Sequence, residues 1–488
     1  MNVFEYLFEQ SYALEKDFVL GSHLHISFRK LNEICYKLSE KLNSLIGENN
    51  QIIILSENSI FQITAYLAIL KSGNICIPLN PAIENENLNQ ILDKTTVSYA
   101  FVSKRYKEKY KNYGLNILDD DFIQSVESDE NYHVAGNSIE FDDNRLAEII
   151  FTSGSTGEQK GVLITHRNII ANTSSIIDYL QLTSADTMEV VLPFYYCYGL
   201  SLLHTHLKVG GSIVMNNNFI FIGSVLNDIN KYKCTGFAGV PSHYQILLRK
   251  TRDFKTSSFP SLRYVTQAGG KLHVIFIREF VETFPDIKFY VMYGQTEATA
   301  RLSYLPPEKL SSKTGSIGKG IPGVTLRVVN DNGEPVKLGE TGEIIAKGDN
   351  IMQGYLNDPV DTAKAIRDGW LYTGDLAQLD EDGFIFIQSR KKEIIKVGGV
   401  RISPQEIEEV IVTYPGVIGC TIESIPDELL GEAIKATVFI NEDDKEIFSE
   451  DLIRKYCASK LSINKLPKVI VFETTLPYNA SGKKVKQV

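Results

Sequence analysis

Helix-length and strand-length apolar segments alternate along the first 80 residues. From 28 to 46 apolar positions recur at helical spacing, and 60–71 predicts a second helix. Short continuous apolar runs at 51–55 and 74–79 instead predict buried strands. Strands that alternate with helices form parallel sheets with crossover connections, so an α/β arrangement is expected to about residue 145.

A polar, acidic stretch at 118–146 interrupts this alternation and is predicted to be a solvated connection. Beyond it the alternation resumes. The next predicted elements are strands at 147–151, 161–165, 189–193 and 289–292 and a helix at 166–180. The α/β character therefore extends to about residue 300.

From residue 315 the pattern changes to short strands with frequent glycine turns, which predicts a small β-rich subdomain. The last hundred residues alternate again and predict a compact α+β module. Its expected helices lie at 403–413 and 449–460, and its strands at 394–397, 416–422, 433–440 and 468–472.

Composition limits the function. A chain of 488 residues exceeds what one core usually holds, so two or more domains are expected. The formal net charge of −10 disfavours a nucleic-acid partner. Six isolated cysteines suit a reducing compartment and predict neither a zinc site nor a disulfide framework. No signal peptide and no apolar run near the ~20 residues of a membrane span is found, so a cytoplasmic protein is expected.

The loop between the strands predicted at 147–151 and 161–165 is the first candidate site. It consists of small, hydroxylated or glycine residues and one lysine, namely Thr152, Ser153, Gly154, Ser155, Thr156, Gly157 and Lys160. Inward backbone N–H groups, hydroxyls and a compact cation make a cradle for polyphosphate oxygens. The spacing is not that of the P-loop. A flexible hairpin turn is the alternative interpretation.

Two further candidates follow predicted strands. Gly269 and Gly270 allow close backbone approach to a flat ligand, and Tyr293-Gly294 precedes Thr296-Glu297. Ligands of open α/β sheets bind beyond the carboxyl ends of strands. The Glu297 carboxylate suits Mg²⁺ that bridges phosphates, although a Thr-Glu pair can also cap a helix.

Aromatic residues at 194–198 predict a pocket wall, with Tyr196, Tyr198 and, from a later strand, Phe237 as candidates; an aromatic core cluster is the alternative. Asp375 can accept two hydrogen bonds from ribose hydroxyls or simply lie in a turn. Arg390 belongs to a charged run typical of a solvated turn, and Lys483 to a basic tail.

These segments, in this order, resemble the AMP-forming adenylating superfamily of acyl- and aryl-CoA synthetases, peptide-synthetase adenylation domains and beetle luciferases. The resemblance spans about residues 25 to 487. It implies an N-terminal adenylation domain (1–390) of α/β subdomains with a β-rich subdomain, and a small mobile α+β C-terminal domain (391–488). Lys392 falls on the hinge between the two domains.

The resemblance also implies residue roles. Residues 152–157 and Lys160 would hold the β- and γ-phosphates of ATP, and Glu297 would hold Mg²⁺. Gly269 and Gly270 would lie against adenine, Asp375 would bind the ribose, and Tyr293, Gly294 and Arg390 would contact the nucleotide. Thr296 would bind the α-phosphate or the substrate carboxylate, and Lys483 would bind the α-phosphate. Tyr196 and Ser389 depart from the family pattern, where histidine and glycine are usual.

The implied activity is that of an AMP-forming acid–thiol ligase, which makes an acyl-adenylate and passes the acyl group to CoA. A stand-alone ligase that loads a carrier-protein phosphopantetheine fits the same residues. A segment that would hold an α-amino group lacks its aspartate, which counts against α-amino acids. A silent nucleotide-binding scaffold is the alternative of another class, and retention of Lys160, Glu297, Asp375 and Lys483 argues against it. A luciferase-like oxygenase has no specific support.

Overall fold

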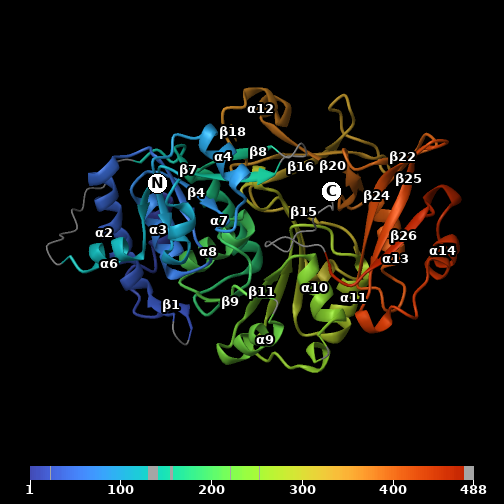
Figure 1. The fold of residues 1–488 in the computed structure, drawn as a ribbon, viewed down its shortest axis with the longest axis horizontal. Coiled ribbons are helices and arrows are strands. Elements are labelled where there is room, and N and C mark those ends of the chain that lie inside the picture. The colour runs from blue at the N-terminus through green and yellow to red at the C-terminus, as the bar shows by residue number, and fades with distance from the viewer. Residues whose placement is uncertain (22–23, 130–140, 154–157, 220, 252, 477–488) are drawn as a thin grey trace.

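The computed structural model describes residues 1–21, 24–129, 141–153, 158–219, 221–251 and 253–476, and Figure 1 shows their arrangement. Within these residues the strands form four sheets of nine, seven, five and five strands. The mixed α/β prediction is confirmed. None of the described helices combines the length and hydrophobicity that crossing a bilayer requires.

The seven-stranded sheet contains the elements predicted near the N-terminus. Its order is β18-β8-β7-β4-β3-β5-β6. The strands are β3 (Gln51–Leu55), β4 (Ile75–Leu79), β5 (Tyr99–Val102), β6 (Asn116–Leu118), β7 (Leu146–Ser153), β8 (Gln159–Thr165) and β18 (Gly354–Tyr355). β3, β4, β5, β6 and β7 run parallel, whereas β8 is antiparallel to β7.

The first helices begin and end where the apolar periodicity predicts. These are α2 (Phe28–Ile46) and α3 (Ile60–Lys71), which follow a shorter α1 (Val3–Phe8). Ser27 and Ser59 cap α2 and α3, since each side chain accepts a hydrogen bond from a first-turn N–H. α3 is buried on all sides from Phe61 to Leu70, as suits a helix in an interior layer.

The nine-stranded sheet has the order β15-β14-β13-β12-β11-β9-β10-β1-β2. Its parallel centre consists of β9 (Thr187–Val190), β10 (Ser212–Met215), β11 (Gly236–Gly239), β12 (Tyr264–Gln267) and β13 (Lys288–Tyr293). The edge strands are β1 (Asp17–Leu20), β2 (Ile26–Ser27), β14 (Ser303–Leu305) and β15 (Lys319–Gly320).

Two helical layers cover the faces of this sheet. α7 (His166–Leu180) and α8 (Cys197–Val209) lie between the two large sheets, as Figure 1 shows. We call this the inner layer. α9 (Ile222–Lys231), α10 (Pro241–Arg249) and α11 (Val274–Thr283) cover the other face and form the outer layer.

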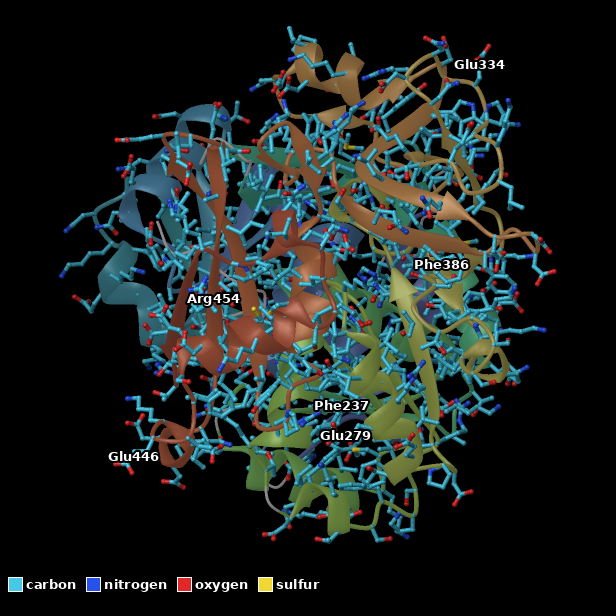
Figure 2. All side chains as sticks on the ribbon, turned by 90° about the vertical axis from the view of Figure 1, so that its right-hand side faces the viewer. Phe237, Glu279, Glu334, Phe386, Glu446 and Arg454 are labelled. Carbon is cyan, nitrogen blue, oxygen red and sulfur yellow. The ribbon has the colours of Figure 1, made fainter. Side chains whose placement is uncertain are left out.

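The β-rich subdomain and the C-terminal module each contain one five-stranded sheet. The first consists of β16 (Thr325–Val329), β17 (Gly342–Lys347), β19 (Ile366–Arg367), β20 (Trp370–Leu379) and β21 (Ile385–Arg390). The second consists of β22 (Ile395–Val397), β23 (Val400–Ile402), β24 (Gly419–Asp427), β25 (Gly431–Phe439) and β26 (Val469–Glu473), with α13 (Pro404–Ile411) and α14 (Glu450–Ala458). Figure 2 views this side, with Arg454 and Glu446 on the module.

One predicted connection was wrong in part. The acidic stretch from 118 contains α6 (Asp120–Glu127), and residues 130–140 lie outside the described part of the chain. Asp119 caps α6 by accepting a hydrogen bond from the Phe122 N–H, and Ile123 and Val126 are buried. The acidic residues therefore favour a helix N-terminus, where negative charge is stabilised by the helix dipole.

Candidate active site

The loop predicted to bind phosphate connects two paired strands. Thr152 of β7 pairs with Lys160 of β8, and Ser153 pairs with Gln159. Gly154, Ser155, Thr156 and Gly157 lie outside the described residues. Backbone pairing between β7 and β8 therefore holds the two ends of the loop beside each other. An added Cβ on Gly161, just beyond Lys160, would lie 2.9 Å from the Ile149 side chain, so this strand position requires glycine.

Lys160 has a protein carboxylate beside it. Its Nζ forms an ion pair with Asp361 of α12 (Pro359–Ala365) and lies 5.2 Å from the ring centroid of Tyr355. The pKa of Asp361 is lowered to about 2, first by the hydrogen bond from Lys160 and then by that from Lys364. The phosphate-loop cation is thus held in place by a counter-charge that a bound polyphosphate could replace.

Thr296 and Glu297 lie on a short turn of 3-10 helix directly after β13. Gly294 makes this turn possible, because an added Cβ would lie 1.9 Å from the Ala300 carbonyl oxygen. The Tyr355 hydroxyl donates a 2.9 Å hydrogen bond to Glu297 Oε1. Thr296 Oγ1 lies 3.6 Å from Cys197 Sγ, at the start of α8. This turn therefore connects the phosphate loop with the inner layer.

Asp375 lies within β20 and is 3% exposed. Its Oδ2 accepts a 2.6 Å hydrogen bond from the Tyr293 hydroxyl, and Arg390 Nε lies 3.1 Å from its Oδ1. Burial raises the pKa of Asp375, and Arg390 and Tyr293 oppose that rise. A carboxylate has about four acceptor positions, so two hydroxyl donors can still be accommodated.

Gly269 and Gly270 leave the sheet next to this group. β12 and β13 are neighbours, with Gln267 paired to Val291, two residues before Tyr293. Gln267 Nε2 donates a 2.6 Å hydrogen bond to the Gly270 carbonyl oxygen, and Gly269 has a φ of +86°. Both glycines are exposed. This backbone turn is held in a conformation that favours glycine and stays open to a ligand.

Side-chain contacts and one chain segment join these residues into a path from Arg390 to Asp361. Its members in order are Arg390, Asp375, Tyr293, Gly294 to Glu297, Tyr355, Lys160 and Asp361. Segments up to 230 positions apart in the sequence, 160 to 390, therefore converge, and they come from both large sheets and from the sheet of the β-rich subdomain. The path contains cations, a carboxylate with one oxygen bonded to Tyr355, and a buried carboxylate. That combination suits a nucleoside triphosphate.

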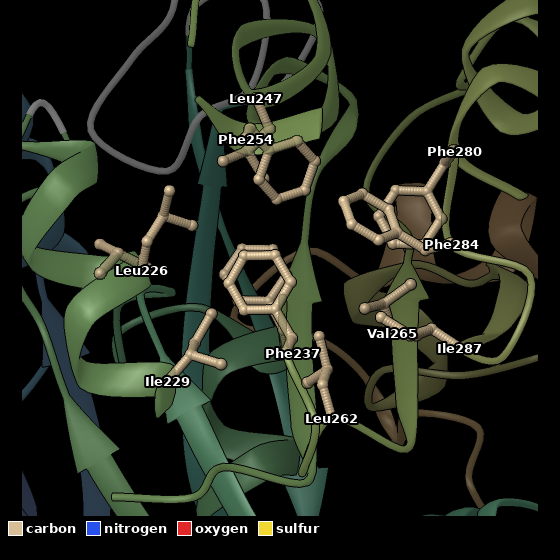
Figure 3. A pocket seen from close by; sticks show the side chains of 12 residues that line it. Leu226, Ile229, Phe237, Leu247, Phe254, Leu262, Val265, Phe280, Phe284 and Ile287 are labelled. Atoms are coloured by element: carbon tan, nitrogen blue, oxygen red, sulfur yellow. The ribbon is translucent and has the colours of Figure 1, made fainter. Parts of the chain in front are cut away.

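The three predicted pocket residues are not all brought together. Tyr198 is buried on the inner layer, where its hydroxyl lies 2.8 Å from Thr266 Oγ1. Phe237 pairs with Val265, whose side chain points to the opposite face from that of Thr266. Phe237 lines a narrow apolar cavity of the outer layer (Figure 3). Tyr196 is half-buried before α8, with its ring 4.8 Å from that of Tyr195.

Two site residues had no signal in the sequence. Tyr355 belongs to the two-residue strand β18, which pairs with β8 almost 200 positions earlier, and Asp361 follows it on α12. Neither lies in a recognisable motif. The buried Arg301 was also missed, because arginine between predicted elements is normally taken to be exposed.

The predicted hinge follows the last strand of the β-rich subdomain. Lys392 comes two residues after Arg390, and the neighbouring Lys391 N–H donates to the Gly374 carbonyl oxygen at 2.9 Å. Ser389, which departs from the family pattern, is buried and paired with Leu376 in the β20–β21 ladder. Lys483 lies outside the described residues, so its role and the hinge remain predictions.

Glu297 is the predicted metal ligand among the described side chains. The described part of the chain contains no group of three or more His, Cys, Asp or Glu side chains that could hold an ion. Glu297 is half-buried with Oε1 bonded to Tyr355. Mg²⁺ is often bound through one or two carboxylates with phosphate oxygens and water, so this arrangement fits it when a polyphosphate is present.

Comparisons with known proteins agree with this geometry. Residues 8–356 match the AMP-binding enzyme family and residues 406–483 match the AMP-binding enzyme C-terminal domain. The chain is 30% identical to 4-coumarate–CoA ligase-like 6 of Arabidopsis thaliana, over 94% of this chain and 84% of that protein. It is 28% identical to an oxalate–CoA ligase of the same plant, over 95% and 93%.

A solved structure has the same overall fold. ATP-bound MatB from Rhodopseudomonas palustris superposes with a TM-score of 0.88 at 25% identity, over 99% of this chain and 96% of that chain. The large α/β region and the small C-terminal module therefore both have counterparts in a protein of known structure.

Proposed function

Because the chain belongs to the AMP-binding enzyme family, within the superfamily of AMP-forming adenylating enzymes, we propose that it is an acid–thiol ligase. It joins a carboxylic acid to ATP as an acyl-adenylate, releases pyrophosphate, and passes the acyl group to a thiol. The observation that carries the proposal is the continuous contact path from Arg390 through Glu297 to Lys160.

In the first step an oxygen of the substrate carboxylate attacks the α-phosphorus of ATP. The bond from that phosphorus to the bridging oxygen breaks, and pyrophosphate leaves with the electron pair. Two anions must meet, so the site has to neutralise charge before and during attack. Lys160 and the hydroxyls of residues 152–156 face the β- and γ-phosphates in this proposal. Thr296 takes the α-phosphate or the attacking carboxylate, and Lys483 supplies the second cation.

The remaining nucleotide contacts follow from the strand ends. Asp375 accepts the ribose hydroxyls while Tyr293 and Arg390 hold its carboxylate in position. The turn at Gly269 and Gly270 lies against adenine. Mg²⁺ held by Glu297 would supply charge neutralisation on the phosphate oxygens when it is bound.

In the second step the thiol sulfur attacks the acyl carbonyl carbon, AMP leaves with the electron pair, and the thiol proton passes to solvent. The named relatives are CoA ligases, which favours CoA as the acceptor. Loading of a carrier-protein phosphopantetheine uses the same chemistry and is the second candidate. The acid is taken to be a small carboxylic acid.

The C-terminal module is proposed to rotate between the two steps about Lys392. In this structure it docks on α11, because Glu409 of α13 accepts hydrogen bonds from His273 Nδ1 at 2.9 Å and from the Val274 N–H at 2.8 Å. Lys271 Nζ lies 3.6 Å from the same carboxylate. His273 and Val274 come three and four residues after Gly270, so this docking supports a module that approaches the proposed adenine turn.

The first experiment is ATP–pyrophosphate exchange with a panel of short, medium, aryl and amino acids. At least one carboxylic acid is expected to support exchange, and added CoA should then convert it to a thioester with release of AMP. Carrier proteins with a phosphopantetheine arm are tested in parallel with CoA. ATP binding without exchange for any acid would favour the scaffold instead.

A matched pair of variants tests the site. Glu297→Gln removes the charge that holds the cation and is expected to lower exchange by about 100-fold or more. Glu308→Gln changes an exposed glutamate a few residues further along and is expected to leave exchange unchanged. Equal exchange by the two variants would remove Glu297 from the site.

A further inference from the structure

The guanidinium of Arg301 is buried in the inner layer. Arg301 is 2% exposed and follows the Thr296–Ala298 turn, just before β14. Its carbon Cζ lies 4.1 Å from the centroid of the Tyr198 ring, and its Nη1 makes a 3.4 Å hydrogen bond to the Ala300 carbonyl oxygen. Burial raises the pKa of Tyr179 and Arg301 opposes that rise, so the guanidinium also lies near this hydroxyl.

The positive charge of Arg301 has no negative partner in the described part of the chain. No carboxylate oxygen there lies within 4.0 Å of it, and its buried Nε makes no hydrogen bond. Two other arginines in this half of the molecule are paired: Arg263 with Asp186 at 2.9 Å and Arg249 with Glu279 at 2.7 Å. An aromatic face compensates only part of the hydration that a buried guanidinium loses.

The backbone of Arg301 is held firmly. Asn350 Nδ2 donates to the Arg301 carbonyl oxygen at 2.7 Å, and Asn172 Nδ2 donates to it at 3.4 Å. Thr299, two residues earlier, donates to the Asn350 carbonyl oxygen at 2.7 Å. The side chain is thus presented by a rigid loop, which is the condition for specific recognition of a ligand.

Arg301 lies deeper than the residues of the adenylation site. Thr296 and Glu297 are half-buried, whereas Arg301 is almost fully buried. Thr296 contacts Cys197 and Arg301 stacks on Tyr198, so both approach the first turn of α8. A substrate whose reacting carboxylate lies at Thr296 would therefore direct its far end along α8 toward Arg301.

We propose that the acid substrate carries a second carboxylate at its far end and that Arg301 binds it. This inference rests on the proposed ligase function and names its substrate class, a dicarboxylic acid. The second carboxylate supplies the counter-charge that the described residues do not provide, and the planar guanidinium can donate two N–H hydrogen bonds to it. A monocarboxylic acid would leave the guanidinium without a partner, and a site of this kind discriminates strongly against such a substrate.

The wild-type enzyme provides the first test, which needs no variant. Exchange rates are compared between matched acids: glutarate with pentanoate, adipate with hexanoate, and phthalate with benzoate. The best dicarboxylic acid is expected to have a kcat/KM about 100-fold or more above that of its monocarboxylic partner. A higher value for the monocarboxylic acids overturns the assignment of Arg301 and leaves the ligase function intact. Absence of exchange with every acid overturns the ligase function and this inference together.

Variants then test the residue itself. Arg301→Met keeps an unbranched apolar stem and removes the charge, and it is expected to lower the dicarboxylate preference by about 100-fold while monocarboxylate kcat/KM falls much less. Arg301→Lys should keep part of the preference. The control is Arg249→Met, which removes an arginine that also stacks on a ring, Phe276, but has its own carboxylate partner. An equal loss for both acid classes in Arg301→Met would overturn the proposal.

Binding is measured separately from turnover. Saturation with the preferred dicarboxylic acid and a non-hydrolysable ATP analogue should raise the Tm of the wild type and of Arg249→Met, and should not raise that of Arg301→Met beyond the effect of the analogue alone. The same rise in all three proteins would overturn the proposal. If Arg301→Met does not fold, Arg301→Lys and the wild-type comparison decide.

Discussion

The inner and outer layers pack on the same strands and differ in chemistry. Thr266 and Tyr290 face the inner layer, and their chain neighbours Val265 and Phe289 face the outer one. The inner layer contains buried hydroxyls and Arg301, whereas the cavity of the outer layer is lined by apolar side chains alone (Figure 3). One set of strands therefore has Arg301 and buried hydroxyls on one face and an apolar cavity on the other. The outer face also buries one carboxyl group, that of Glu189, which pairs with Phe237 and lies 3.8 Å from Cys234 Sγ.

The inner layer also contains a polar network between the two large sheets. The Tyr66 hydroxyl of α3 lies 2.9 Å from Glu148 Oε2 of β7 and 2.8 Å from His204 Nε2 of α8. Buried polar groups cost stability unless their hydrogen bonds are satisfied. We therefore expect the outer layer to stabilise the fold mainly by apolar burial, whereas the inner layer depends on the pairing of its polar groups.

The largest expected effect belongs to the outer layer. Phe280 of α11 is 2% exposed, and its ring centroid lies 5.1 Å from that of Phe289 and 5.2 Å from that of Phe284. Phe280→Ala is expected to lower the free energy of unfolding by about 3–5 kcal/mol, because it leaves a cavity that the neighbouring rings cannot fill. Urea denaturation followed by circular dichroism measures it. Phe280→Leu is the control with a smaller loss, and a loss below about 1 kcal/mol for Phe280→Ala would contradict this division of roles.

The next effect is a pH dependence in the inner layer. Burial raises the pKa of Glu148 from 4.5 to about 7, and the hydrogen bond from Tyr66 opposes that rise. A carboxyl group whose pKa is higher in the folded state stabilises the fold fully at a pH below its unfolded pKa of 4.5. This contribution is lost as the pH rises through the folded pKa of about 7. Glu148→Gln keeps the shape without the titration.

Glu148→Gln is therefore expected to be more stable than the wild type near pH 8 and about equally stable near pH 5. The Tm of both proteins is measured across this range. Burial lowers the pKa of His204 from 6.5 to about 3, so both proteins lose stability as the pH falls through about 6.5, and this shared effect cancels in the comparison. Parallel pH profiles for the two proteins would show that Glu148 does not carry the effect.

The sequence predicted the positions of helices better than the directions of side chains. α2, α3 and α7 begin and end where the apolar pattern placed them, and a Ser or Thr cap marks the N-terminal end of each. The division of Phe237 and Tyr198 between two faces depends on the strand register, which a four-residue strand does not reveal.

The residues of the candidate site were also predicted only in part. Glu297 and Asp375 were predicted because they lie in motifs, and the structure connects both to one contact path, while their roles stay predictions. Tyr355 and Asp361 were not found, because β18 pairs with a strand almost 200 positions away. A pairing over that distance is decided by the folded chain, and two residues carry too little pattern to indicate it.

The smallest expected effect separates two hydroxyls of the inner layer. Tyr264 is fully buried, and its hydroxyl makes no hydrogen bond within the described residues, whereas the Tyr198 hydroxyl is bonded to Thr266. Removal of an unsatisfied buried hydroxyl costs nothing in hydrogen bonds and relieves its desolvation. Tyr264→Phe should thus change the free energy of unfolding by less than about 1 kcal/mol, in the stabilising direction, and Tyr198→Phe should destabilise by about 1 kcal/mol. If urea denaturation shows equal losses for both variants, the Tyr264 hydroxyl has a hydrogen-bond partner of its own. The inner layer would then contain fewer unsatisfied polar groups than we infer.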